Sequence, residues 1–340
     1  MRQHLQDIYS GIDKQMYHLV SSGVTPGVSY ALIDGEDVFC QYLGDRQELP
    51  QRTPLTAGLY YDLASLTKVV GTTPLFVRAL TEGKLQLDDH LVDYLPDFSV
   101  PSVTFRELMT HTSGLEGYIP HRDELPAPEL QRALTTQLHR GAGEGQHVVY
   151  RDFNLLLTGW ALERIYGAPV QQLITEMVLT PFGLTDNCTF NPDQAQCVGT
   201  SYTATTGLRQ GVVHDPKAAI LREHSAAAGM FATLQGLVQY VQILTAVRSQ
   251  NILPADWARQ LQHSYSGANG RSIGFDLRYS ASGATWLYHT GYTGTFMLVS
   301  PQSRQGLVVL ASRVHPYVHP EFLNLRDIIV PEYLQLAENA

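Results

Sequence analysis

Cysteine is scarce in this chain, and basic residues are outnumbered by acidic ones. Three cysteines (Cys40, Cys188 and Cys197) occur among 340 residues, an odd number too small for a disulfide framework and without the C-x-x-C pairs of a metal knuckle. A reducing compartment is the simplest interpretation. Lysine and arginine total 23 against 32 acidic residues, which gives a formal charge of −9. We therefore expect no nucleic-acid partner, because the sequence has no basic stripe that could neutralise a phosphate backbone.

Long apolar runs are missing as well. No stretch approaches the roughly 18 apolar residues of a membrane span, and residues 1–20 lack the apolar core of a signal peptide. The sequence thus predicts a cytoplasmic protein without a membrane span. Hydrophobic residues make up 44% of the chain and charged residues 16%, which excludes disordered, collagen-like and coiled-coil chains. The length favours two structural units, although one large α/β enzyme fits it too.

Both ends of the chain carry sheet-forming patterns with a helix outside them. Residues 28–45 and 284–312 contain β-branched and aromatic runs joined by turn residues, which predicts two hairpins. Residues 321–336 predict a closing helix with a break at Pro331. An opening amphipathic helix is predicted from apolar residues three or four positions apart, namely Leu5, Ile8, Ile12, Met16 and Leu19.

The middle of the chain is dominated by helical patterns between proline and glycine loops. Residues 1–70 and 248–340 are therefore predicted to form one discontinuous α/β domain, an antiparallel sheet covered by the first and last helices. Residues 71–247 are predicted to form a mainly helical lobe inserted into it. A cleft between the two units is the expected active site.

Ser65 and Lys68 form an S-x-x-K pattern at the start of an apolar segment. On a helix, residues three apart share a face, so the Lys68 amine can lie beside the Ser65 hydroxyl. A serine needs a neighbouring base to become a nucleophile, and a desolvated lysine can be that base. Alone the pattern is weak, because solvated helices often carry this pair.

Two further polar groups follow the S-x-x-K pattern. Tyr150-Arg151-Asp152 precedes an apolar helix, where a helix start capped by Asp152 is the ordinary structural interpretation. His289-Thr290-Gly291 lies on a predicted strand, where a glycine lets a ligand approach the backbone and a strand-end turn is the alternative.

Together the three groups resemble the serine β-lactamase and penicillin-binding protein superfamily, in particular its class C-like branch of esterases and peptidases. Their order matches S-x-x-K, Y-x-N and K-T-G, and the resemblance extends from about residue 27 to about residue 315. It implies an α/β fold of the β-lactamase/transpeptidase type, with a central antiparallel sheet flanked by N- and C-terminal helices and an inserted all-helical lobe.

The resemblance also implies an acyl-enzyme mechanism without cofactor or metal. Ser65 attacks a carbonyl, Lys68 and the Tyr150 phenolate share its proton, and water hydrolyses the resulting ester. The backbone N–H groups of Ser65 and Tyr292 form the oxyanion hole. The implied substrate-binding residues are Asp152, His289, Thr290 and Gly291.

Two positions depart from the family pattern. Asp152 stands where relatives usually carry asparagine, so an acceptor-only carboxylate replaces two amide donors and favours the charged form of Lys68. His289 replaces the lysine of K-T-G, which removes a fixed positive charge that helps to hold a substrate carboxylate. This change argues against efficient turnover of β-lactams or D-alanyl-D-alanine.

Three functions therefore stay open. The first is a serine hydrolase that cleaves a small ester or amide. The second is a penicillin-binding D-alanyl-D-alanine carboxypeptidase or β-lactamase, which shares Ser65, Lys68 and Tyr150 with the first. The third is a non-catalytic binder of peptides or muropeptides.

Several histidines are assigned structural positions. His111 and His214 are interpreted as turn residues. The H-x-x-x-H spacing of His315 and His319 is interpreted as a loop with solvated histidines, because the prolines after each histidine oppose a zinc-binding helix.

Overall fold

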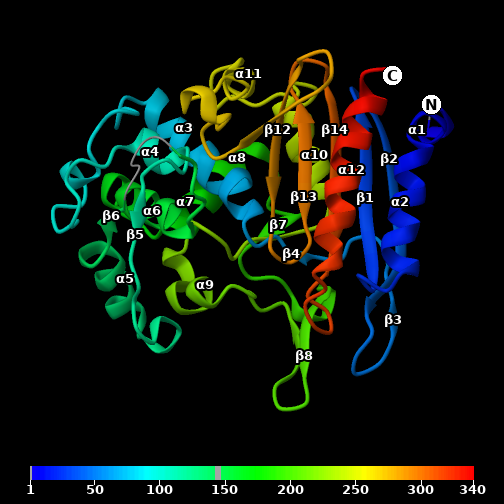
Figure 1. Cartoon of the computed structure of the whole chain (residues 1–340), viewed down its shortest axis with the longest axis horizontal. Helices are drawn as coiled ribbons and strands as arrows, with labels where there is room; N and C mark the ends of the chain where they lie inside the picture. The colour runs from blue at the N-terminus through cyan, green and yellow to red at the C-terminus, as the bar shows by residue number, and fades with distance from the viewer. Residues whose placement is uncertain (1, 142–146) are drawn as a thin grey trace.

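The computed structural model describes residues 2–141 and 147–340. A seven-stranded antiparallel sheet forms its centre and joins the two ends of the chain, because the C-terminal strand pairs with the N-terminal one (Figure 1). Both predicted hairpins are confirmed. In spatial order the strands are β11 (Asp276–Tyr279), β12 (Thr285–Thr290), β13 (Phe296–Ser300), β14 (Gln305–Ala311), β1 (Gly27–Asp34), β2 (Asp37–Gln47) and β3 (Thr53–Pro54).

Helices α1 (Arg2–Ile8), α2 (Ser10–Ser21) and α12 (Glu321–Ala337) cover one face of this sheet. The single opening helix predicted from the sequence is divided at Tyr9, whose ring stacks on Tyr333 at a centroid distance of 5.2 Å. The predicted break at Pro331 is wrong, since α12 continues through it. Buried residues on both sides of the proline pack against the sheet, and this packing outweighs the lost backbone hydrogen bond.

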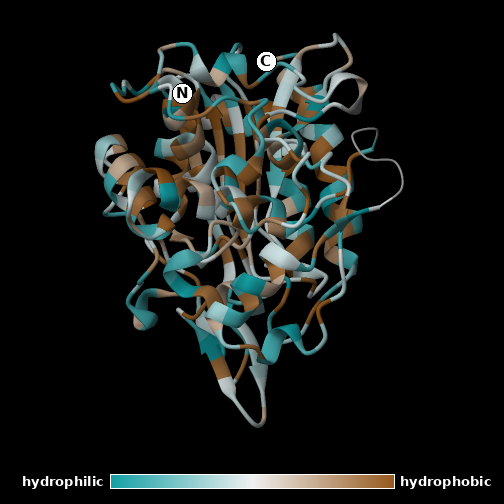
Figure 2. Ribbon diagram, turned by 90° about the vertical axis from the view of Figure 1, so that its left-hand side faces the viewer, coloured by the Kyte–Doolittle hydropathy of each residue, from teal (hydrophilic) through white to brown (hydrophobic). Residues whose placement is uncertain are grey.

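The opposite face of the sheet packs against α10 (Leu234–Leu244) and the helical part of the chain. Hydrophobic residues, brown in Figure 2, line the strands and the inner sides of the helices, while hydrophilic ones gather outside. The remaining helices are α3 (Thr73–Thr81) with the π-helical segment Lys68–Thr72 before it, α4 (Phe105–Met109), α5 (Ala127–Thr136), α6 (Asp152–Tyr166), α7 (Val170–Ile174), α8 (Thr180–Phe182), α9 (Pro216–Leu221) and α11 (Trp257–Gln260).

Short strands interrupt the helical part. β8 (Gly199–Thr203) and β9 (Gly207–Gln210) form a hairpin that projects from the molecule in Figure 1. The others are β4 (Tyr61–Asp62), β10 (Phe231–Ala232) and β7 (Cys188–Thr189) in one small sheet and β5 (Leu115–Glu116) with β6 (His139–Arg140) in another.

His315 lies in the loop after β14 and is fully buried, so its assignment as a solvated residue is wrong. Its Nε2 accepts hydrogen bonds from the backbone N–H groups of Glu48 and Leu49. Burial lowers the pKa of His315 to about 4, which keeps the imidazole neutral and able to accept. The histidine therefore ties the loop after β2 to the loop after β14.

The predicted division into residues 1–70 with 248–340 and residues 71–247 stays a prediction. Helix α10 belongs to the second of these units in sequence, yet it packs on β14 and β1 of the central sheet. In the two described stretches, no helix has both the length and the apolar character needed to cross a lipid bilayer.

Candidate active site

A tight turn after strand β4 presents Ser65 immediately before the helical segment that starts at Leu66. The Asp62 carboxylate accepts a hydrogen bond from the backbone N–H of Ala64 at 2.8 Å. Ala64 has a φ of 45°, in the left-handed region that non-glycine residues rarely occupy. Burial raises the pKa of Asp62 to about 6. This strained turn places Ser65 on the wall of a cavity.

Lys68 lies one helical turn after Ser65, and its side chain is fully buried. Its Nζ donates to Ser65 Oγ at 2.8 Å, to Asp152 Oδ1 at 2.9 Å and to the Ala227 carbonyl at 2.8 Å, so all three N–H donors have partners. Burial opposes the charged form, but the negative charges of Asp152 and Tyr150 outweigh it and raise the pKa of the Lys68 ammonium. The direction of this shift is the one expected for a carboxylate at position 152.

Tyr150 lies beside this lysine. Its ring centroid is 5.3 Å from Lys68 Nζ, and the side chain is 41% exposed, so it is open to a substrate. The ring packs between two histidines, with centroid distances of 4.3 Å to His111 and 6.0 Å to His289. His111, assigned to a turn from the sequence, therefore also supports the tyrosine of the site.

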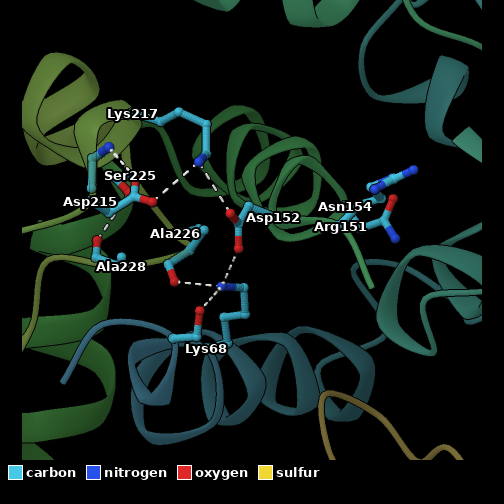
Figure 3. Close-up of polar contacts among 12 residues, drawn as sticks. Lys68, Arg151, Asp152, Asn154, Asp215, Lys217, Ser225, Ala226 and Ala228 are labelled. Atoms are coloured by element: carbon cyan, nitrogen blue, oxygen red, sulfur yellow. Dashed lines mark hydrogen bonds and ion pairs between the residues drawn. The ribbon is translucent and has the colours of Figure 1, made fainter. Parts of the chain in front are cut away.

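Asp152 joins two lysines. It is the first residue of α6, and Arg151 takes the cap position, so the interpretation of Asp152 as the cap is wrong. Its Oδ1 pairs with Lys68, and its Oδ2 lies 3.1 Å from Lys217 Nζ (Figure 3). Burial opposes ionisation, but the two ammonium groups outweigh it and hold the pKa of the Asp152 carboxyl far below its usual range. Lys217 also pairs with Asp215 at 3.1 Å.

His289 is the penultimate residue of strand β12 and is 4% exposed. Burial, reinforced by the nearby charges of Arg271 and Lys68, lowers the pKa of His289 well below its ordinary value. Its imidazole is therefore neutral at physiological pH, and the positive charge that a lysine would bring here is missing. Its neighbour Thr290 lines the same cavity as Ser65.

Gly291 is required by the fold of the site. A Cβ at this position would collide with the Leu63 carbonyl oxygen and with Thr295 Oγ1. Thr295 Oγ1 in turn donates to the Leu63 carbonyl at 3.1 Å. The structure shows that this glycine lets the chain carrying Ser65 lie directly against the end of β12. That it also lets a ligand approach the backbone stays a prediction.

Two backbone N–H groups remain free beside the nucleophile candidate. Ser65 and Tyr292 both line its cavity, and no acceptor among the described residues receives a hydrogen bond from either N–H group. This is the arrangement that stabilises an oxyanion. The Tyr292 carbonyl accepts from Arg313 Nε at 2.8 Å, and the Thr293 hydroxyl donates to the Asp62 carbonyl at 2.7 Å, so this turn is fixed relative to Ser65.

The cavity at Ser65 has a volume of about 650 Å³. A neighbouring cavity of about 710 Å³ shares Tyr150, Asp152 and Lys217 with it. The first cavity is lined by Ala64, Ser65, Tyr150, Asp152, Arg209, His214, Asp215, Pro216, Lys217, Ala228, Thr290 and Tyr292. The structure thus brings the S-x-x-K serine, the tyrosine and the H-T-G strand to one hollow, as expected from the three motifs.

Sequence reasoning missed four charged or polar residues of this cavity, namely Arg209, His214, Asp215 and Lys217. A local signal existed, because an Asp-Pro pair is typical of a helix start, and the Asp215 side chain does cap α9. Nothing in the spacing connects that helix with Ser65, however, so its place in the site could not be predicted.

The model of the Beta-lactamase family matches residues 12–330. The chain belongs to this family. This match confirms the family resemblance seen in the motifs. Solved structures confirm the β-lactamase/transpeptidase-like fold, with its central antiparallel sheet flanked by helices.

Curated proteins that are similar to this chain include some named as carboxypeptidases. A putative D-alanyl-D-alanine carboxypeptidase of Escherichia coli (strain K12) is 24% identical over 326 residues, which cover 80% of this chain and 74% of the relative. The D-alanyl-D-alanine-carboxypeptidase/endopeptidase AmpH of the same strain is 26% identical over 336 residues, or 89% of this chain and 83% of the relative.

Solved structures of the same fold carry several activities in their names. EstCE1, a hydrolase with promiscuous acyltransferase activity, matches with a TM-score of 0.77 and 21% identity over 95% of this chain and 98% of its own. A β-lactamase/D-alanine carboxypeptidase from Pseudomonas syringae matches with a TM-score of 0.75 and 17% identity over 95% and 98%. At these identities the likeness establishes the fold alone.

Proposed function

We propose that this serine hydrolase of the Beta-lactamase family cleaves a small ester or amide through an acyl-Ser65 intermediate. The observation that carries the proposal is the contact between Lys68 Nζ and Ser65 Oγ at 2.8 Å, next to Tyr150 and to two free backbone N–H groups. A nucleophile, a base and an oxyanion site within one cavity are the parts that acyl transfer requires.

The raised pKa of Lys68 favours Tyr150, not Lys68, as the group that takes the serine proton. Because Asp152 keeps Lys68 charged, the ammonium orients the Ser65 hydroxyl and stabilises the Tyr150 phenolate, and the phenolate oxygen takes the serine proton. Ser65 Oγ then bonds to the substrate carbonyl carbon, and the N–H groups of Ser65 and Tyr292 bind the oxyanion.

Collapse of this intermediate breaks the bond to the leaving group, which receives the proton from Tyr150. A water molecule then attacks the acyl-serine ester and gives its proton to Tyr150. The ester bond to Ser65 then breaks, Ser65 Oγ regains its proton from Tyr150, and the acid product leaves. The complete cycle thereby restores the starting protonation of the site.

The activity of the carboxypeptidase-like relatives is the second candidate, favoured by the names of the curated matches. The neutral, buried His289 weakens it, because that position lacks the fixed cation that helps to hold a substrate carboxylate. The presence of Ser65 and Tyr150 in one cavity, with the buried Lys68 hydrogen-bonded to Ser65, supports an enzyme over a non-catalytic binder.

The test combines turnover of p-nitrophenyl butyrate with intact-protein mass after exposure to benzylpenicillin. We expect ester turnover that falls by about 10,000-fold in Ser65→Ala, and no stable penicillin adduct. The exposed Ser303→Ala variant is the matched control and should hydrolyse the ester normally. A persistent adduct that needs Ser65 would support a penicillin-binding protein instead, and no Ser65-dependent reaction with either reagent would support the binder.

A further inference from the structure

Lys217 is a second lysine in the active-site cavity. It lies in the first turn of α9, and its side chain is 11% exposed. Its ammonium pairs with Asp152 and with Asp215, each at 3.1 Å, as Figure 3 shows. An ammonium has three N–H donors, and the described part of the chain supplies partners for two of them. Lys217 lines both the cavity of Ser65 and the neighbouring one.

The charges around this lysine are almost balanced. Asp152 and Asp215 offset Lys68 and Lys217, because each carboxylate is held within 3.1 Å of an ammonium. These ion pairs hold Lys217 in one position without leaving a free carboxylate to repel an anion. The arrangement is therefore preorganised to offer an N–H donor to a negatively charged group.

Arg209 adds a cation without a balancing partner. It lies on strand β9 and lines the Ser65 cavity. Within residues 2–141 and 147–340, no group forms a hydrogen bond or ion pair with its guanidinium. Asp62 is the carboxylate whose charge it influences, but that group is buried and accepts hydrogen bonds from the backbone N–H groups of Ala64 and His214.

We infer that Arg209 and Lys217 bind a carboxylate that the substrate carries in addition to its scissile carbonyl. The two residues supply the anion binding that the neutral His289 cannot. They lie on β9 and α9, whereas His289 lies on β12. This assignment rests on the proposed acyl-Ser65 chemistry and names its substrate class, a carboxylate-bearing ester or amide. A guanidinium and an ammonium in a partly buried cavity bind such a group through charge-assisted hydrogen bonds.

The test compares four esters in two matched pairs. Mono-p-nitrophenyl glutarate against p-nitrophenyl butyrate places the carboxylate on the acyl side. The butyrate ester of 4-hydroxybenzoate against phenyl butyrate places it on the leaving group. In the pair that fits the site, we expect kcat/KM to be about 10- to 100-fold higher for the charged ester. We expect Arg209→Met and Lys217→Met each to reduce that ratio about tenfold, mainly through KM.

Two further variants distinguish carboxylate binding by Lys217 from the effect of its ion pair with Asp152. Asp152→Asn combined with Lys217→Met removes the ion pair as a unit and should lower the ratio as much as Lys217→Met alone. Arg259→Met, an exposed arginine on α11 away from the cavities, should leave it unchanged. If Ser65-dependent turnover occurs but neither ratio exceeds about two, or if the variants change both esters of a pair alike, the inference is wrong. If none of the four esters reacts through Ser65, the proposed function itself fails.

Discussion

At the scale of single residues, the state of Lys68 depends on one substitution. An amide at position 152 would offer Lys68 a hydrogen bond without a charge, whereas the carboxylate of Asp152 adds a full negative charge 2.9 Å away. Burial opposes the charged form of this lysine, and the charge of Asp152 is the largest of the contributions that raise its pKa. The proton-transfer roles that we propose for Lys68 and Tyr150 therefore depend on Asp152.

The variant Asp152→Asn tests this dependence. Removing a carboxylate lowers the pKa of every neighbouring base, because its negative charge stabilised their protonated forms. We expect the acidic limb of the pH profile of kcat/KM for p-nitrophenyl butyrate to move to lower pH by about one unit. Asp327→Asn, an exposed position on α12, serves as the control. An acidic limb that stays in place would show that Asp152 does not set the charge of the base.

At the scale of elements, the site depends on how strand β12 ends. The strand carries Thr290 to the cavity, with His289 buried just before it, and then meets the turn that leads to Ser65. Gly291 allows this contact, since its missing side chain leaves room for the Leu63 carbonyl oxygen. The hydroxyl of Thr295 holds the same carbonyl, so sheet and nucleophile turn are fixed together.

Gly291→Ala should disturb stability and activity at once. The new methyl group must push the Leu63 segment away from β12, so we expect the free energy of unfolding to fall by about 2–4 kcal/mol. We expect kcat/KM to fall more than tenfold, since Ser65 moves with that segment. Urea denaturation and ester turnover measure the two effects.

Gly283→Ala is the matched control. It lies in the turn before β12 at a φ of 86° with no atom near the added Cβ. It should cost about 1 kcal/mol of backbone strain and leave turnover intact. Equal effects of the two variants would refute a specific role for the contact between Gly291 and Leu63.

At the scale of the whole molecule, one buried cluster crosses the predicted domain boundary. It contains residues on the face of the sheet that packs against α10, such as Ile33 and Val308, together with Leu155 and Trp160 of α6. Val241 of α10 is fully buried and lies over Gly306 of β14, where an added methyl group would meet it. Such continuous packing favours unfolding as one unit.

We therefore expect a single urea transition, with the same midpoint by far-ultraviolet circular dichroism and by tryptophan fluorescence. Trp160 and Trp286 report on the helical part and on the sheet. Val241→Ala should lower the free energy of unfolding by about 2 kcal/mol, because it leaves a cavity between α10 and the sheet, without separating the two signals. Two distinct transitions would instead support residues 71–247 as an independently stable unit.

The sequence by itself determined the local features of this protein. The pairing of Lys68 with Ser65 was predictable because residues three apart share a helix face, and the contact is 2.8 Å. The β1–β2 hairpin was predictable because its strands are joined by a short turn. The order of the three motifs indicated the family, which the family model confirmed.

Only the tertiary structure decided which distant residues meet. Asp152 and Lys217 are 65 positions apart, and no periodicity connects them, so their ion pair depends on where α9 packs in the folded chain, in contact with α5. The contact of Gly291 with Leu63 likewise joins segments from opposite ends of the chain. Backbone hydrogen bonding fixes neighbours within an element, whereas contacts between elements are selected by side-chain packing over the whole core. The motifs could therefore be identified from the sequence, but the charges that surround them could not.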